Sequence, residues 1–262
     1  MLNVRKISEI KSPKKLIMLT AYDYAFSGLV AKAGADIVLV GDSLGMVFNG
    51  HDTTLPVTLD EMIYHAKAVR RGAPDTFMTV DMPFMSYQES VSQAKKSAGR
   101  IMKETGAQAV KLEGGSEAVE AIKAITDIGI PVMGHIGTQP QSVNKYGGYV
   151  VSGATPEEGA RLIKSAKDIE DAGVFSIVLE KVKSECAAEI TSSVKVPTIG
   201  IGAGPHCDGQ VLVTYDLLGL FEDFNPKFVK KYDNFAARTE KAIKKFIKEV
   251  KSSKYPGKKH YY

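Results

Sequence analysis

The chain has 262 residues, of which 44% are hydrophobic and 24% charged, and its net charge of +4 is small; these values exclude a disordered or fibrous protein. Two cysteines, Cys186 and Cys207, exclude a disulfide framework and predict free thiols in a reducing compartment. No apolar run approaches the ~20 residues that span a bilayer, and the first residues lack the apolar core of a secretory signal, so we expect a soluble, cytoplasmic protein.

Eight short apolar runs predict β-strands. They lie at residues 16–21, 37–41, 77–81, 109–113, 131–135, 176–180, 197–201 and 210–214. Most of them are too apolar to leave one face in water, which is typical of a parallel sheet covered on both faces. Helical patterns fall between the runs. Three of these helices are predicted to begin at capping boxes, at 58–61, 86–89 and 155–158.

Eight βα-like units without a Pro-, Gly- or Ser-rich linker predict one domain over residues 1–262. The length and the repeat favour a single (β/α)8 TIM barrel, an α/β fold. Two parts of the sequence fit this prediction less well. The connection between the last two strands is short, and the helix expected after the eighth strand has a weak pattern. A doubly wound open sheet is the alternative.

The last part of the chain, residues 227–262, is strongly basic. It has 12 Lys or Arg and 3 Asp or Glu, so it carries +9 and the remainder of the chain −5. A basic tail is one signature of nucleic-acid binding, but apolar residues recur here at helical spacing from Phe235 to Val250. We therefore expect an amphipathic helix with solvated lysines, packed on the body or at a subunit interface, and no nucleic-acid or membrane partner.

Four acidic residues, Asp42, Asp81, Glu113 and Glu180, each stand at the last position of a short apolar run that predicts a buried strand. A single carboxylate in that position is as often a helix cap or a loop acceptor. Four of them at one end of a parallel barrel, where active sites lie, repel one another unless a cation neutralises them. The all-oxygen set predicts a metal-dependent site for a hard ion such as Mg²⁺.

Two further polar residues are expected at the same end of the barrel. Lys111 shares a strand face with Glu113, and His135 ends the fifth predicted strand. Each has a plainer interpretation, as a Lys111–Glu113 salt bridge and as a satisfied core histidine. Together with the carboxylates they suit a 2-oxo acid, which chelates Mg²⁺ through its carboxylate and keto oxygens and so acidifies the adjacent carbon. One carboxylate must stay off the metal to act as the base.

Several segments in order along the chain resemble the ketopantoate hydroxymethyltransferase family. They are VGDSLGM at 40–46, TLPVT at 54–58 with DEM at 60–62, DMPF at 81–84, VKLEGG at 110–115, GHIG at 134–137 with PQS at 140–142, and DGQVLV at 208–213. The resemblance implies a TIM barrel that transfers a one-carbon group from 5,10-methylenetetrahydrofolate to 3-methyl-2-oxobutanoate. The product would be 2-dehydropantoate, for pantothenate (coenzyme A precursor) biosynthesis.

Matching positions in these motifs imply a role for each site residue. The resemblance implies a metal shell, formed directly or through water, of Asp42, Asp81 and Glu113. It implies a set of residues that contact the oxo acid, made up of Asp42, Ser43, Asp81, Lys111 and His135. Glu180 would be the general base. A homodecamer is also implied, with the C-terminal helix packed between subunits.

Two departures from the family pattern and one long connection stand out. Lys181-Val-Lys183 follows Glu180 where the family has a Val-Pro pair, and Met82 replaces a common leucine. Residues 137–153 form a connection longer than the usual ~2–6 residues and are a candidate lid.

Two other functions compete with this interpretation. One is a Mg-dependent 2-oxo acid lyase or mutase of the phosphoenolpyruvate mutase/isocitrate lyase type, although neither cysteine lies in a matching motif. The other is a folate-binding scaffold without turnover. The crowded charged residues disfavour it, because charges brought together without a function are costly to the fold.

Overall fold

The computed structural model describes residues 2–221 and 226–262. The chain divides into two compact units, Met1–Val213 and Thr214–Tyr262. Within the described residues, no helix is both long and apolar enough to cross a bilayer.

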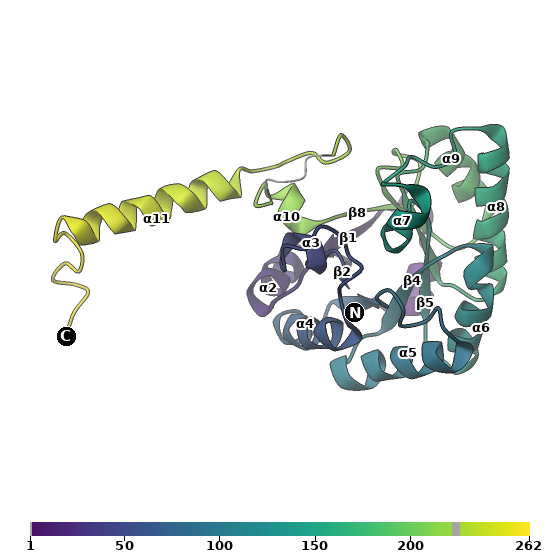
Figure 1. Ribbon diagram of the computed structural model, residues 1–262, viewed down its shortest axis with the longest axis horizontal. Coiled ribbons are helices and arrows are strands. Elements are labelled where there is room, and N and C mark those ends of the chain that lie inside the picture. Colours follow the sequence, from purple (N-terminus) through teal and green to yellow (C-terminus); the bar gives the residue numbers. More distant parts are fainter. Residues whose placement is uncertain (1, 222–225) are drawn as a thin grey trace. The chain divides into compact units, whose positions relative to one another are not determined.

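The first unit is a closed barrel of eight parallel strands (Figure 1). The strands are β1 (Leu16–Thr20), β2 (Ile37–Val40), β3 (Phe77–Asp81), β4 (Ala109–Glu113), β5 (Val132–Gly137), β6 (Ser176–Glu180), β7 (Thr198–Ile201) and β8 (Gly209–Leu212). Each strand pairs with the next, and β8 pairs with β1. The predicted TIM barrel is confirmed, the open doubly wound sheet is excluded, and every strand end lies within two residues of its predicted position.

Helices alternate with the strands and surround them (Figure 1). The α-helices of this unit are α1 (Val4–Ser8), α2 (Tyr24–Lys32), α3 (Leu44–Val47), α4 (Leu59–Gly72), α5 (Val91–Thr105), α6 (Val119–Asp127), α7 (Val143–Tyr146), α8 (Pro156–Asp171) and α9 (Ser184–Ser193). Two 3₁₀ turns, η1 (Ser116–Ala118) and η2 (Pro140–Ser142), precede α6 and α7. The connection between β7 and β8 is described throughout and contains no helix, which explains why it is short in the sequence.

The predicted capping boxes have three different outcomes. The box that starts α4 is complete, with Thr58 and Glu61 each bonded to the other's backbone. At α8, Thr155 accepts from the Glu158 amide, but the Glu158 carboxylate accepts from Ala154 instead of Thr155. The box predicted at 86–89 is wrong, because α5 begins later and Ser90 is its N-cap. Ser86 and Tyr87 are buried instead, and the Tyr87 hydroxyl contacts Glu113 and Gln141 at the barrel mouth.

The barrel interior is apolar towards the N-terminal ends of the strands. Inward side chains from all eight strands and their flanks form one buried cluster that includes Leu16, Ile37, Phe77, Ala109, Met133, Phe175, Ile199 and Val211. Ile7 of α1 belongs to the same cluster, and Val4 and Ile10 pack against it, so α1 covers this end. The apolar filling leaves the polar inward residues at the opposite, C-terminal end of the strands.

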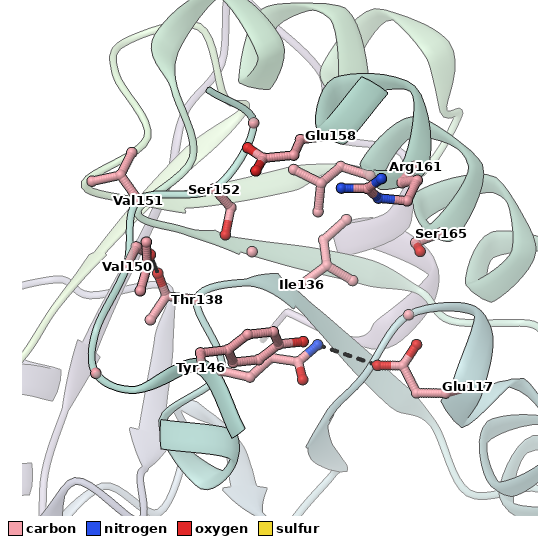
Figure 2. A pocket seen from close by; sticks show the side chains of 16 residues that line it. Glu117, Ile136, Thr138, Tyr146, Val150, Val151, Ser152, Glu158, Arg161 and Ser165 are labelled. Carbon is pink, nitrogen blue, oxygen red and sulfur yellow. Dashed lines mark hydrogen bonds between the residues drawn. The ribbon is translucent and has the colours of Figure 1, made fainter. Parts of the chain in front are cut away.

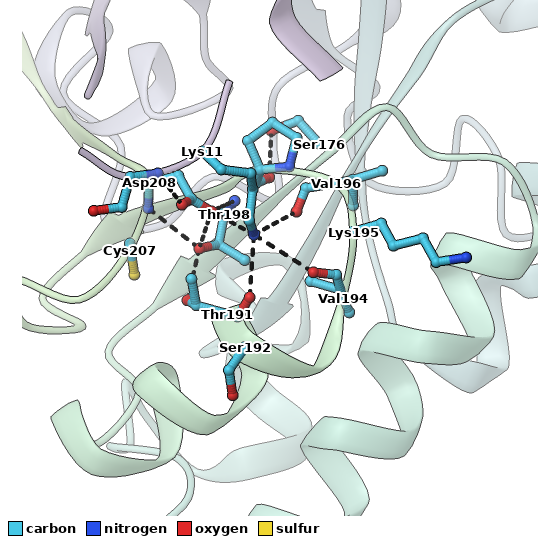
Figure 3. A network of polar contacts seen from close by, with 12 residues as sticks. Lys11, Ser176, Thr191, Ser192, Val194, Lys195, Val196, Thr198, Cys207 and Asp208 are labelled. Atoms are coloured by element: carbon cyan, nitrogen blue, oxygen red, sulfur yellow. Dashed lines mark hydrogen bonds and ion pairs between the residues drawn. The ribbon is translucent and has the colours of Figure 1, made fainter. Parts of the chain in front are cut away.

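A buried polar network ties the N-terminal segment to the barrel (Figure 3). The Lys11 ammonium lies 2.8 Å from Asp208 Oδ2 and also donates to the carbonyl oxygens of Thr191 and Val196. The Asp208 carboxylate accepts from the backbone amides of Ser12 at 3.1 Å and Thr198 at 3.0 Å. The network therefore joins the segment before β1 to the ends of α9, β7 and β8.

The second unit contains α10 (Thr214–Leu217) and α11 (Phe235–Lys251). Asn234 caps α11 by accepting from the Ala237 amide. The amphipathic helix is confirmed, and its apolar side chains Ile243, Phe246, Ile247 and Val250 are each about half exposed. The helix expected after the eighth strand is a single turn, α10, which explains its weak sequence pattern.

Candidate active site

The carboxylates predicted from strand ends lie together at the C-terminal mouth of the barrel. Asp42 lies two residues after the end of β2, and Asp81 and Glu113 end β3 and β4; all three are buried. Asp81 Oδ2 accepts from the Asp42 amide at 3.1 Å. A Cβ at Gly41 would lie 2.8 Å from Ser43 Oγ but only in ordinary contact with Asp81. The hydrogen bond from the Asp42 amide therefore places the first two carboxylates next to each other.

Lys111 supplies the positive charge of the cluster. Its ammonium lies 3.0 Å from Asp81 Oδ1, so its ion-pair partner comes from the neighbouring strand and the predicted Lys111–Glu113 bridge is not the pairing observed. Burial alone lowers the pKa of Lys111, but Asp81, Asp42 and Glu113 outweigh it and raise the pKa above its usual value. The side chain is therefore a fixed cation at all physiological pH values.

His135 lies between the two sides of the site. Its Nδ1 is 3.4 Å from Lys111 Nζ and 3.6 Å from Glu113 Oε1, and its Nε2 is 3.3 Å from Glu180 Oε2. Burial and the Lys111 charge lower the pKa of His135, so the imidazole is neutral near pH 7. Because an ammonium can only donate, Nδ1 is the acceptor and Nε2 carries the proton that faces Glu180. His135 thus lies among the predicted site residues, in contact with Lys111, Glu113 and Glu180.

Glu180 and Ser43 occupy more open positions than the three buried carboxylates. The Glu180 side chain retains 19% exposure, while that of Asp81 retains 5%. Ser43 is half-buried, and its Oγ lies 2.9 Å from the hydroxyl of Tyr22. Glu180 is therefore the carboxylate of this group that a substrate can most easily reach.

Gln141 is a residue of the site that the sequence analysis missed. Its Nε2 donates to Asp42 Oδ2 at 2.8 Å and to the Met82 carbonyl at 2.9 Å, and its backbone amide donates to Glu113 Oε2 at 3.0 Å. Tyr87 Oη donates to Gln141 Oε1 at 2.9 Å, which fixes the orientation of the amide. Gln141 stands inside the PQS motif, but it is uncharged and follows no strand directly, so the strand-end pattern could not find it.

The cluster holds an excess of negative charge. Burial and then Asp81 raise the pKa of Asp42 to about 7, although Lys111 and Gln141 oppose the shift. Burial and then Asp42 raise the pKa of Glu113 well above its usual range. Lys111 offsets only part of this charge, and its ammonium already pairs with Asp81 Oδ1 at 3.0 Å. A divalent cation would relieve the remaining repulsion.

The carboxylates do not by themselves make a finished metal site. In residues 2–221 and 226–262, no three Asp, Glu, His or Cys side chains converge closely enough to hold an ion together. Part of any coordination shell would therefore have to come from water or from a substrate, which is usual for Mg²⁺. The metal roles of Asp42, Asp81 and Glu113 stay a prediction.

The long connection after β5 is fastened on both sides of the mouth. Tyr149 Oη lies 3.5 Å from Met46 Sδ of α3, and the Ser152 amide donates to the Lys181 carbonyl at 2.9 Å. The Lys181 ammonium donates to the Tyr149 carbonyl and lies 5.9 Å from the centre of its ring. Lys181, one of the departures from the family pattern, directly follows Glu180. Its contacts with Tyr149 therefore hold this loop next to the end of β6.

The sequence matches a known family over nearly its whole length. The family is described as ketopantoate hydroxymethyltransferase, and residues 1–258 match it. The 3-methyl-2-oxobutanoate hydroxymethyltransferase of Leptospira interrogans is 51% identical over 99% of this chain and 99% of its own length. That of Chlorobaculum tepidum is 53% identical over 95% of this chain and 91% of its own.

Solved structures share the barrel at low sequence identity. Phosphonopyruvate hydrolase superposes with a TM-score of 0.63 at 12% identity, over 97% of this chain and 88% of its own. The 2,3-dimethylmalate lyase, a member of the PEP mutase/isocitrate lyase superfamily, gives 0.58 at 16% identity, over 98% and 90%. These likenesses show the fold alone, so the lyase or mutase alternative has no support beyond it. By its sequence the chain belongs to the ketopantoate hydroxymethyltransferase family, and it is an enzyme of the transferase class.

Proposed function

We propose that this enzyme transfers a hydroxymethyl group from 5,10-methylenetetrahydrofolate to 3-methyl-2-oxobutanoate, which forms 2-dehydropantoate for pantothenate biosynthesis. The observation that carries the proposal is the buried cluster of Asp42, Asp81 and Glu113 around the Lys111 ammonium at the barrel mouth. Relatives about half identical in sequence are named for this acceptor. We also propose a cytoplasmic location and a homo-oligomeric assembly, a decamer by the family resemblance.

The donor atoms of the cluster suit a hard divalent cation such as Mg²⁺. Asp42 and Asp81 would hold it through carboxylate oxygens, with Glu113 acting directly or through water. The raised pKa of Asp42 supports this assignment, because burial and the neighbouring Asp81 charge both disfavour its ionised form, which a cation would stabilise. When bound, the ion would supply the Lewis acidity that stabilises the oxygen of an enolate.

The remaining residues bind and orient the oxo acid. Lys111 is a permanent ammonium and is suited to the substrate carboxylate, with which it forms a charge-assisted hydrogen bond. Ser43, Asp42, Asp81 and His135 complete the proposed contact set. Lys111 already pairs with Asp81. The substrate carboxylate would therefore share the Lys111 ammonium with Asp81.

Glu180 takes the proton from C3 of the oxo acid. The C3–H bond breaks, the proton passes to a Glu180 oxygen, and the electron pair forms the enolate. The methylene carbon loses both of its bonds to the folate nitrogens and gains one bond to C3 and one to a water oxygen. The C3 proton and one proton of that water pass to the two nitrogens, so tetrahydrofolate leaves. The neutral His135 directs its Nε2–H towards Glu180 Oε2 at 3.3 Å and so orients the base.

Exchange of the C3 proton in D₂O, without the folate donor, tests this function. A positioned general base typically contributes ~10²–10⁴-fold, so Glu180→Gln should slow the exchange by about that factor. Glu185→Gln, on the exposed side of α9, is the matched control and should exchange like the wild type. Chelation should stop the exchange, and Mg²⁺ should restore it. Exchange at full rate in Glu180→Gln would assign the base elsewhere, with His135 next in line.

A further inference from the structure

A cavity of about 400 Å³ lies between α8 and the connection that follows β5 (Figure 2). Ile136, Val150 and Leu162 line it with apolar surface, and Tyr146 adds an aromatic ring. Arg161 extends into it from α8 (Figure 2). The volume falls within the ~300–1,000 Å³ range of small-molecule sites, and the mixture of apolar walls with one cation is typical of them.

The cavity and the active site share the same strand ends. Gly137 and Thr138 line the cavity, and the Thr138 amide donates to the Glu180 carbonyl at 2.8 Å. Side chains alternate along β5, so His135 lies among the carboxylates while Ile136 lines the cavity. A ligand that fills the cavity therefore lies beside the strands that carry the proposed base and its histidine.

Arg161 gives the cavity a cationic group that can pair with a carboxylate of a ligand. Glu158 accepts from the Ala154 amide at 2.8 Å, and Glu117 accepts from Gln139 Nε2 at 3.4 Å, so both carboxylates are engaged. Arg161 makes no hydrogen bond or ion pair with the residues that the structure describes, and its exposed guanidinium influences only the titration of Glu157. A guanidinium fork matches a carboxylate in two hydrogen bonds.

We propose that this cavity binds the aromatic, carboxylate-bearing tail of the one-carbon donor, which in methylenetetrahydrofolate is the p-aminobenzoyl-glutamate part. Arg161 pairs with a tail carboxylate, and Tyr146 and the apolar wall contact the ring. The assignment rests on the proposed function, because only that reaction requires a folate donor.

Two arguments select the tail over the pterin ring. The carboxylate cluster and Lys111 at the barrel mouth are assigned to the metal ion and the oxo acid, whereas Arg161 in the cavity is available to a tail carboxylate. The edge of a pterin ring that carries its N–H groups would need a carboxylate to accept from them. Both carboxylates of the cavity, Glu158 and Glu117, already accept hydrogen bonds from the protein. The tail therefore extends away from the reacting centre, and the pterin stays near the mouth.

Calorimetric binding of two probes tests the assignment. One is 5-formyltetrahydrofolate, a stable analogue that carries the tail, and the other is a tetrahydropterin without a tail. Arg161→Met should weaken binding of the first by about tenfold or more and leave the second unchanged, because a lost charge-assisted pair is worth ~1.5–3 kcal/mol. Lys167→Met removes an exposed charge from the same helix outside the cavity and should bind both probes like the wild type.

The outcomes separate this assignment from the proposed function. If Arg161→Met binds the tailed analogue as tightly as the wild type does, the cavity is not the tail site. Equal weakening of both probes would also overturn it, since a general disturbance of the fold explains that result. The proposed function is judged separately, by C3 exchange of the oxo acid in the wild type without any folate. Arg161→Lys should recover part of the lost affinity, since it restores the charge without the fork.

Discussion

Asp42 is held in a state that a carboxyl group does not adopt in water. Burial is the largest cause of its raised pKa, and the Asp81 charge adds to it. Gln141 donates to the same carboxylate and partly compensates. Ionised Asp42 therefore destabilises the metal-free fold, and binding of a cation or of a proton removes this destabilisation.

The metal-free protein should lose stability as the pH rises towards 7. The pKa of Asp42 is about 7 in the fold and 3.8 is its ordinary value, so the folded state binds more protons in between. The stabilisation that comes from protonated Asp42 is complete below pH 3.8 and is lost as the pH rises through about 7. The free energy of unfolding should fall by roughly 2–4 kcal/mol over this range. Urea unfolding in chelator from pH 5 to 8 measures this, and Asp42→Asn should flatten the slope. An equally steep slope in the variant would remove Asp42 as its source.

Gln141→Leu should destabilise the protein and loosen the connection after β5. The substitution leaves the Met82 carbonyl and Asp42 Oδ2 without their donor, at ~1–3 kcal/mol for each buried group. Amide exchange across residues 143–153 should become faster, as measured by mass spectrometry. Gln139→Leu is the matched control, because its amide makes one long contact at 3.4 Å with Glu117. If the two variants behave alike, Gln141 does not hold this loop.

At the scale of elements, the strands could be predicted because each one is an unbroken apolar run. The same runs located Asp81, Glu113 and Glu180, since a strand end in a parallel barrel lies at the mouth. Gln141 could not be located in this way, because its position depends on how a long loop folds back over three strands. The box predicted at 86–89 failed for a related reason: Tyr87 binds Gln141 and Glu113, and these tertiary contacts override the local helix signal.

Lys11→Met should destabilise the barrel more than an ordinary surface change. Asp208 is almost fully buried and would lose the ammonium at 2.8 Å. Lys11 is about a third exposed, which moderates the effect to roughly 1–3 kcal/mol, below that of a fully buried pair. Denaturant unfolding measures it, with Lys14→Met, an exposed neighbour, as the control. Equal midpoints for the two variants would show that the network in Figure 3 contributes little to stability.

At the scale of the whole molecule, the proposed homo-oligomer depends on α11. The helix presents Ile243, Phe246, Ile247 and Val250 as a half-exposed apolar face, which monomeric proteins seldom leave uncovered. We expect light scattering at micromolar concentration to show a particle larger than a dimer. Ile247→Lys with Phe246→Ser should reduce the particle size, whereas Lys244→Ser, on the basic surface of the same helix, should not. A wild-type monomer would contradict the proposal.

The apolar and the polar clusters lie at opposite ends of the barrel, and this separation has a consequence for engineering. The apolar cluster beneath the strands and the polar cluster above them are built from different side chains, with Ile7 and Lys11 at one end and Asp42, Lys111 and Glu180 at the other. Stabilising substitutions commonly reduce activity when they relax a strained active site. Here the lower half can be repacked, or its α1 cover reinforced, without contact with any reacting group. Substitutions at the N-terminal end of the barrel can therefore raise the thermal stability of the protein without changing the residues that determine its turnover.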